Sequence, residues 1–85
     1  MAYTVSFKTP ARKALDKLPV EMKTRLVRAA DALAIDPRPR GVKKLHGDEN
    51  LWRVRVGSYR LVDEIHDEQL IVLIVRVADR KDVYR

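Results

Sequence analysis

One stretch decides how the rest of this chain must fold: residues 51–62 read Leu-Trp-Arg-Val-Arg-Val-Gly-Ser-Tyr-Arg-Leu-Val. Apolar and cationic side chains alternate on both sides of Gly57-Ser58, which predicts two half-buried strands joined by a two-residue turn. With that dipeptide at the centre of the turn, Arg55 lies opposite Arg60, and Arg53 shares their face. The other face carries the side chains that we assign to the core: Trp52, Val54, Val56, Tyr59 and Leu61.

The flanking sequence supplies the remaining elements. Thr9-Pro10 predicts a helix start, because proline at the first helical position loses no hydrogen bond, and Pro19 ends that helix. The β-branched run from Leu70 to Val77 suits a central strand buried on both faces. The expected elements are a strand at 3–7, helices at 10–18 and 20–35, and strands at 51–56, 59–65 and 70–77. This order predicts an α+β fold: an N-terminal strand, a helical hairpin and a three-stranded antiparallel meander, with the helices on one face of a mainly antiparallel sheet.

Length and composition exclude several classes of protein. Eighty-five residues suffice for one small domain, so we expect a single domain over residues 1–85. The absence of cysteine excludes disulfide scaffolds, cysteine-ligated zinc and thiol catalysis. His46 and His66 are far apart and lack the spacing of metal ligands, so we expect neither a metal nor another cofactor.

Charge indicates the kind of partner. Eighteen Lys and Arg against 12 Asp and Glu give a net charge of +6, which suggests a polyanionic partner. Composition alone leaves nucleic acid, an acidic protein, an anionic membrane and a merely solvated basic surface open. The first residues, 1–4, show no basic stretch followed by an apolar signal core, and no apolar run is long enough to span a bilayer. We therefore expect a cytoplasmic protein.

The three hairpin arginines call for a physical explanation. Like charges directly opposite each other across strands are destabilising by up to about 1 kcal/mol. One explanation is a solvated face with splayed arginine stems or nearby acids such as Glu49 and Glu64. The other is an anion site, most plausibly for phosphate, which the guanidinium fork matches in a bidentate way.

The C-terminal segment adds cations and an aromatic ring to this pattern. Residues 76–85 read Arg-Val-Ala-Asp-Arg-Lys-Asp-Val-Tyr-Arg, and basic residues interleaved with an aromatic suit single-stranded nucleic acid. A tyrosine near a chain end is alternatively a packing residue. The acidic pairs Asp63-Glu64 and Asp67-Glu68 are expected on the solvated surface, although the hairpin register turns Asp63 toward the core.

Three stretches resemble one family of proteins. They are Lys-Lys-Leu-His-Gly at 43–47, the hairpin at 51–62, and Val-Ala-Asp-Arg-Lys-Asp-Val-Tyr at 77–84. Together with the opening strand and helical hairpin, they resemble the RelE/ParE superfamily of bacterial toxins over essentially the whole chain. The resemblance implies the fold derived above and a toxin that is neutralised by a cognate antitoxin protein.

The RelE branch of that superfamily cleaves messenger RNA in the ribosomal decoding site without a metal. The 2′-hydroxyl attacks the adjacent phosphate and leaves a 2′,3′-cyclic phosphate. The resemblance places the catalytic set on Arg53, Arg55, Arg60, Arg80 and Tyr84. It implies the ribosome and messenger RNA as partners, and no direct sequence-specific DNA binding or membrane association. The alternative is the ParE branch, which poisons DNA gyrase without chemistry of its own.

Two further features qualify the resemblance. Arginine at both Arg53 and Arg55, where lysine is frequent in the ribonuclease branch, stabilises charge but is a poor general base. Asp79 precedes Arg80 where many relatives have histidine or lysine.

Flanking phosphates are assigned to a second group of cations: Arg38, Arg40, Lys43, Lys44 and Lys81.

Overall fold

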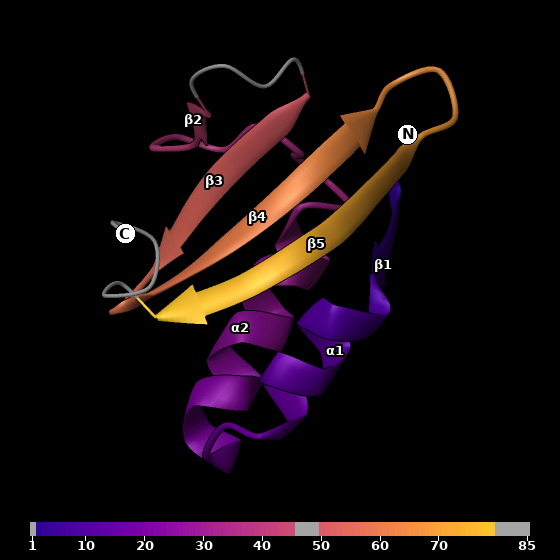
Figure 1. The fold of residues 1–85 in the computed structure, drawn as a ribbon. Helices are drawn as coiled ribbons and strands as arrows, with labels where there is room; N and C mark the ends of the chain where they lie inside the picture. The colour runs from indigo at the N-terminus through magenta and orange to yellow at the C-terminus, as the bar shows by residue number, and fades with distance from the viewer. Residues whose placement is uncertain (1, 46–49, 80–85) are drawn as a thin grey trace.

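The computed structural model describes residues 2–45 and 50–79, which form two helices and five strands (Figure 1). In chain order they are β1 (Thr4–Phe7), α1 (Thr9–Asp16), α2 (Val20–Ala32), β2 (Lys43–Lys44), β3 (Leu51–Val56), β4 (Tyr59–His66) and β5 (Ile71–Asp79). The predicted α+β class is confirmed. The two-residue strand β2 was not predicted, because two consecutive lysines give no alternating pattern.

The five strands form one mixed sheet in the order β1-β5-β4-β3-β2. Strands β3, β4 and β5 are the predicted antiparallel meander, and β2 extends it by pairing antiparallel to β3. Strand β1 pairs parallel to β5, with Thr4 opposite Ile71. The first and the last strand of the chain are therefore neighbours.

Both helices depart slightly from the predicted boundaries. Helix α1 begins at Thr9, with Lys8 as the N-cap residue, so Pro10 is in the first turn but not at its first position. Helix α2 ends at Ala32 because the amides of residues 33–35 each bond to a carbonyl three residues earlier, which tightens the last turn. Over residues 2–45 and 50–79, no helix has the length and apolar character needed to cross a membrane.

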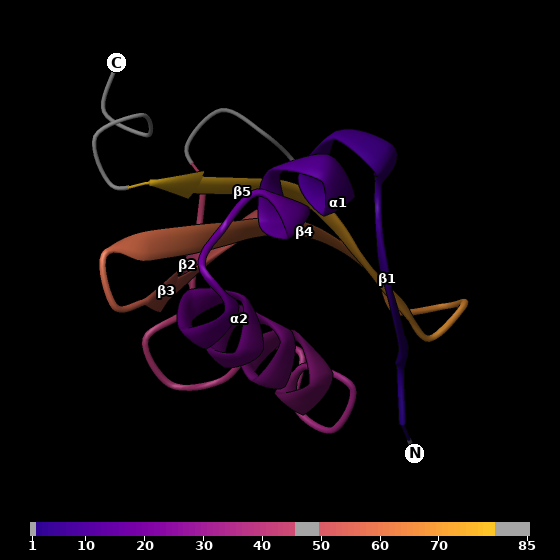
Figure 2. The same ribbon diagram turned by 90° about the horizontal axis from the view of Figure 1, so that it is seen from below.

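The core lies between the helical layer and one face of the sheet. Figure 2 shows both helices on the same side of the strands. Their apolar stripes bury against alternate residues of β4 and β5, and burial of one such side chain stabilises the fold by about 1.5–3 kcal/mol. The fully buried cluster consists of Ala11, Leu15, Leu26, Ala30, Leu33, Leu61, Val72, Ile74 and Val77. The opposite face of the sheet, here called the open face, has no described helix over it.

The β3–β4 turn has the predicted register. Arg55 pairs with Arg60 and Val56 with Tyr59, which leaves Gly57 and Ser58 as the central turn residues. Gly57 has a φ of +60°, which belongs to the first central position of a type II′ turn, where glycine is strongly preferred. A β-carbon added at Gly57 would also approach the Arg25 guanidinium to 3.3 Å.

Strand β5 contains one residue more than its partner β4. Val62 pairs with Arg76, but the next residue, Asp63, pairs with Ile74, so Val75 is the extra residue of a β-bulge. The bulge lets both Ile74 and Val77 face the core. The prediction that this run is buried on both faces is wrong in part, since Val75 is half-buried and Arg76 is exposed on the open face.

The core predicts a sharp difference between two apolar truncations. Leu26 is fully buried, whereas Ile35 is 79% exposed just after α2. Leu26→Ala should lower the free energy of unfolding by about 2–5 kcal/mol through lost burial and the cavity left behind. Ile35→Ala should change it by no more than about 0.5 kcal/mol. Urea unfolding measures both, and equal losses in the two variants would contradict this assignment of the core.

Candidate functional site

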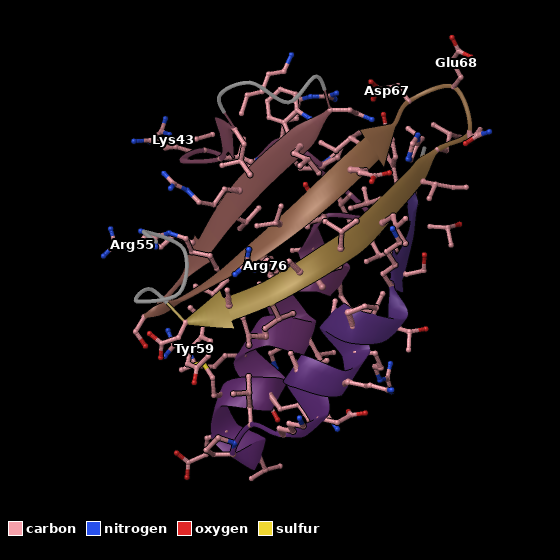
Figure 3. The ribbon with its side chains drawn as sticks, viewed as in Figure 1. Lys43, Arg55, Tyr59, Asp67, Glu68 and Arg76 are labelled. Atoms are coloured by element: carbon pink, nitrogen blue, oxygen red, sulfur yellow. The ribbon has the colours of Figure 1, made fainter. Side chains whose placement is uncertain are left out.

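Cations from three strands gather on the open face near the β3–β4 turn. The sheet register aligns Arg55, Arg60 and Ala78 in one cross-strand row. The next row runs from β2 to β5 through Lys43, Arg53, Val62 and Arg76. Figure 3 shows Lys43, Arg55 and Arg76 toward this end of the sheet, and Asp67 and Glu68 at the opposite end. We call the set of Lys43, Arg53, Arg55 and Arg76 the basic face.

The exposed cations of the basic face are not the same as the three hairpin arginines that the sequence predicted, Arg53, Arg55 and Arg60. Arg55, Arg76 and Lys43 are exposed, and Arg53 is half-buried. Arg60 has the predicted strand position, but it is only 3% exposed, beside Ala78 at 5%. The expectation of three exposed guanidiniums is therefore corrected: Arg60 is buried and Arg53 is half-buried, and the exposed cations of this face are Lys43 of β2, Arg55 of β3 and Arg76 of β5.

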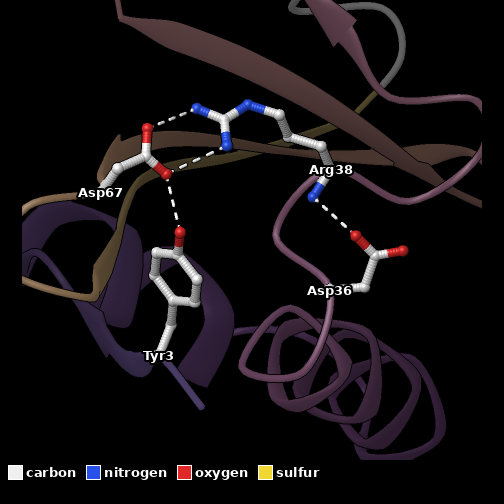
Figure 4. Close-up of polar contacts among 4 residues, drawn as sticks. All are labelled: Tyr3, Asp36, Arg38 and Asp67. Atoms are coloured by element: carbon white, nitrogen blue, oxygen red, sulfur yellow. Dashed lines mark hydrogen bonds and ion pairs between the residues drawn. The ribbon is translucent and has the colours of Figure 1, made fainter. Parts of the chain in front are cut away.

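Arg38, predicted to bind phosphate, is part of a polar network away from the basic face (Figure 4). Its guanidinium donates two hydrogen bonds to the Asp67 carboxylate, at 3.1 and 2.9 Å. The Tyr3 hydroxyl donates a third to the same carboxylate at 2.7 Å. The Arg38 amide also bonds to the Asp36 carboxylate at 3.2 Å. This network joins the loop after α2 to the β4–β5 turn and the N-terminal segment.

The hydrogen bonds of this network change the acidity of its groups. Arg38 and then Tyr3, by donating to Asp67, lower the pKa of that carboxyl to about 2. The same bond raises the pKa of the Tyr3 hydroxyl, because ionisation of Tyr3 would remove a donor from a carboxylate. The prediction that Asp67 lies on the solvated surface is confirmed, since its side chain is exposed; its hydrogen bonds to Arg38 and Tyr3 were not predicted.

Trp52 is held between two of the predicted phosphate ligands. The Arg38 guanidinium carbon lies 4.8 Å from the centre of the indole ring, and the Lys44 ammonium lies 5.8 Å from it. Both distances are in the range of cation–π contacts. Because Lys44 pairs with Trp52, it shares the core side of the sheet, whereas Lys43 faces the open side. Arg40 is exposed in the loop before β2.

Asp63 is a buried carboxyl group, not the solvated one expected from its acidic neighbour. It has no exposed surface, and among residues 2–45 and 50–79 neither of its oxygens has a hydrogen-bond partner. Desolvation raises the pKa of this carboxyl to about 7, and the charge of Arg38 opposes that shift. Asp63 pairs across the strands with Trp52, whose buried indole nitrogen also has no partner in the described part of the chain. The predicted turn of Asp63 toward the core is thus seen in the structure.

Three predicted site residues, Arg80, Lys81 and Tyr84, lie outside the described residues. Arg76, which sequence reasoning left out of the site, joins the basic face through the bulge. Its signal in the sequence is a lone arginine between two valines in an apolar run. Within residues 2–45 and 50–79, no three histidine or carboxylate side chains are grouped in a way that could hold a metal ion.

A second concave feature lies beside the sheet. A groove of about 400 Å³ runs between α1 and the ends of β4 and β5. Lys13 and Lys17 line it together with the carboxylate Asp79, so its cations outnumber its acid by two to one, and Leu18, Tyr59 and Val77 contribute apolar surface. It is separate from the basic face, because Tyr59 and Val77 point to the core side of the sheet.

Comparison with known proteins assigns the family. A family model described as the ParE toxin of the type II toxin–antitoxin system parDE matches residues 5–84. The chain belongs to this family. It is a toxin of the RelE/ParE superfamily, as the sequence resemblance predicted.

Individual relatives of the toxin are of the RelBE type. Toxin RelG of Mycobacterium tuberculosis is 38% identical over 86 residues, covering 100% of this chain and 99% of that protein. The toxin in the crystal structure of the RelBE2 toxin–antitoxin complex from the same organism is also 38% identical, with a TM-score of 0.84, 94% of this chain and 100% of that chain covered. An archaeal RelE–RelB complex from Pyrococcus horikoshii gives 30% identity and a TM-score of 0.83, with 94% and 97% covered.

Burial of Asp63 predicts a pH-dependent stability. Between 3.8, the ordinary pKa, and the raised value of about 7, the folded toxin holds a proton that the unfolded chain has lost. The free energy of unfolding should therefore fall by about 1 kcal/mol per pH unit as pH rises through this range, and then level off. Asp63→Asn should abolish this slope and be more stable than the parent at pH 8.

Asp67→Asn is the matched control. The pKa of Asp67 is lowered, so its contribution is lost only as pH falls from about 4 toward about 2, and this variant should keep the slope between pH 4 and 7. Chemical denaturation across pH measures all three proteins. A parent protein whose stability rises between pH 4 and 7 by the same amount as Asp63→Asn would contradict the burial argument.

Proposed function

We propose that this toxin cleaves messenger RNA on the ribosome by metal-independent attack of the 2′-hydroxyl on the adjacent phosphate, which breaks the bond from phosphorus to the 5′-oxygen and gives a 2′,3′-cyclic phosphate and a free 5′-hydroxyl. The observation that carries the proposal is the basic face. Its exposed cations lie on one side of the sheet. No described carboxylate forms an ion pair with Arg53, Arg55 or Arg76 within residues 2–45 and 50–79. Unpaired guanidiniums at strand spacing suit a polyphosphate backbone.

In this proposal the arginines stabilise the charge that builds up on the scissile phosphate. Arg53 and Arg55 approach it from β3, Arg60 supports them from the middle strand, and Arg80 joins from the segment after β5. Preorganised donors of this kind are each worth about 10²–10³ in rate. Tyr84 stacks on a splayed base at about 1–3 kcal/mol. Arginine retains its proton, so these groups supply electrostatic stabilisation rather than general-base catalysis.

Flanking contacts position the message without reading its sequence. Lys43 and Lys81 hold neighbouring phosphates, with Arg40 reaching from its loop, and selectivity comes mainly from the geometry of the ribosome. Arg38 and Lys44, which the sequence assigned to flanking phosphates, have a structural role in this proposal. Their contacts with Asp67 and Trp52 make them supports of the loop before β2.

The second candidate is a toxin that inhibits DNA gyrase without cleaving RNA. Two observations favour it. The matching family model is described as the ParE toxin. Asp79 also precedes Arg80 where the ribonuclease branch often has histidine or lysine. The exposed Arg55 and the half-buried Arg53 of β3, together with Arg80 and Tyr84 in the sequence, favour the nuclease.

Arg55→Ala and Arg80→Ala test the nuclease. Each should reduce cleavage of ribosome-bound message by about 10²–10³-fold, because each removes a charge from the phosphate site. The measurement is the yield of new message 5′ ends on translating ribosomes. Arg28→Ala is the matched control, since Arg28 is exposed on α2, in the helical layer, and should cleave like the parent.

Two results would overturn the proposal. Parent-level cleavage by both site variants would remove the phosphate role. Gyrase-dependent DNA breaks without new message ends, on expression of the parent toxin, would establish the second candidate instead.

We further propose a cognate antitoxin as partner, since the structural neighbours include toxin–antitoxin complexes. The groove beside α1 suits an amphipathic acidic helix of that partner. Its lysine-lined side complements carboxylates, and its apolar surface accepts leucine-type side chains.

Charge reversal tests this assignment. The double variant Lys13→Glu/Lys17→Glu should bind the antitoxin more weakly, mainly through a slower association rate, because rim charges steer the encounter. Lys8→Glu, an exposed charge near the start of the same helix but not lining the groove, is the control. Association measured by surface plasmon resonance with equal loss in both proteins would reject the groove as the docking site.

A further inference from the structure

Arg76 stands out among the cations of the open face because the backbone changes its register to place it there. Val72, Ile74 and Val77 all face the core, so strict alternation along β5 would break between Ile74 and Val77. The extra residue, Val75, has no partner on β4 and shifts the alternation by one position, so that Ile74 and Val77 both face the core. Without the bulge, a strand with Val72 and Ile74 in the core would also turn residue 76 inward. Bulges of this kind commonly re-aim a side chain next to a functional site.

Arg76 also completes a line of charge across the sheet. It pairs with Val62, which pairs with Arg53, which pairs with Lys43. Neighbouring strands are about 4.8 Å apart, so the Cα atoms of Arg53 and Arg76 are separated by about 10 Å. The long side chains at these two positions can bracket a phosphate between them or hold successive phosphates.

Nothing in the described part of the chain neutralises this line. Along β3, β4 and β5, Glu64 is the carboxylate that faces the open side, and it contacts His66 at 2.9 Å rather than a cation of the basic face. Arg76 itself is exposed and forms no ion pair or side-chain hydrogen bond with the described residues. The bulge places Arg76 on the same face as other cations, where like charges repel each other across the strands. No described carboxylate offsets this repulsion.

We propose that Arg76 is a further phosphate-binding residue, and that single-stranded RNA crosses the strands along the row Lys43–Arg53–Val62–Arg76. This inference rests on the proposed function and extends it by giving the RNA a direction across the sheet. The guanidinium of Arg76 binds a backbone phosphate in a bidentate way. Val62, between the two arginines, is only 6% exposed, so the contacts along this row come from the cations. Binding through phosphate carries no sequence preference.

The test measures RNA binding separately from cleavage. The probe is a fluorescent single-stranded 2′-O-methyl RNA, in two unrelated sequences, which the proposed mechanism cannot cleave. Anisotropy titrations at several salt concentrations give the slope of log Kobs against log salt, which changes by about 0.7 for each phosphate contact to a single strand. The proteins compared are the parent, Arg76→Ala, Arg76→Lys, Arg55→Ala and the control Arg28→Ala.

Arg76→Ala should bind both RNAs more weakly, to the same extent, with a slope smaller by about 0.7. Arg76→Lys should restore the slope and part of the affinity, because it keeps the charge but loses the bidentate fork. Arg28→Ala should bind like the parent. A merely structural role for Arg76 would change the melting temperature without changing the slope.

The outcomes separate this inference from the proposed function. If Arg55→Ala reduces the slope and Arg76→Ala does not, the RNA site stands and the role of Arg76 is overturned. If neither variant changes the slope, or the parent does not bind RNA at low salt, both fail. If Arg76→Ala weakens only the complex with the antitoxin, Arg76 belongs to a protein interface and the inference is overturned.

Discussion

The type II′ turn at Gly57-Ser58 is the constraint on which the functional surface depends. Side chains alternate between the two faces of a strand, so a shift of one residue at this turn would exchange every side chain of β3 between core and solvent. The positive φ of Gly57 strongly favours glycine at this position, and a larger residue would also have to displace the guanidinium end of the flexible Arg25 side chain. The turn therefore determines together which residues form the core and which cations form the basic face.

The repulsion between like charges on the open face is offset by the apolar packing on the other face of the sheet. On the core side, β4 and β5 bury an almost wholly apolar set against two helices. On the open side, cations occupy the end near the β3–β4 turn, while Asp67 and Glu68 lie at the other end (Figure 3). The basic face therefore concentrates positive charge toward one end of the sheet. Such a concentration of charge orients an approaching polyanion before any specific contact forms.

Sequence reasoning succeeded where local chemistry decides the outcome. The dipeptide Gly57-Ser58 fixes the hairpin, Pro19 separates the helices, and the order of elements follows from these signals. It failed where packing between distant segments decides. The bulge at Val75 keeps Val72, Ile74 and Val77 on the core side of the sheet, and no short sequence pattern predicts it. The pairing of Arg38 with Asp67 likewise depends on a loop and a turn that are 29 residues apart.

Burial of charged residues was the least predictable property of the site. The register gave the correct face for Arg60 and Asp63, but not their exposure. Both lie on β4, but β5 also has neighbours on both sides and its Arg76 is exposed, so the place of a strand in the sheet does not by itself decide exposure. Exposure depends on how distant segments pack over each face, which the sequence pattern does not give.

The parallel pairing of β1 with β5 has a consequence for the synthesis of this toxin. Thr4 pairs with Ile71, 67 residues later in the chain, so β1 has no partner strand until β5 has been synthesised. Such long-range closure is slow and requires nearly the whole chain. A nascent chain that stops before β5 therefore lacks the strand that joins the N-terminal half to the hairpin. A chain interrupted before β5 therefore cannot form the five-stranded sheet, and the toxin fold is complete only after residues 71–79 have been synthesised.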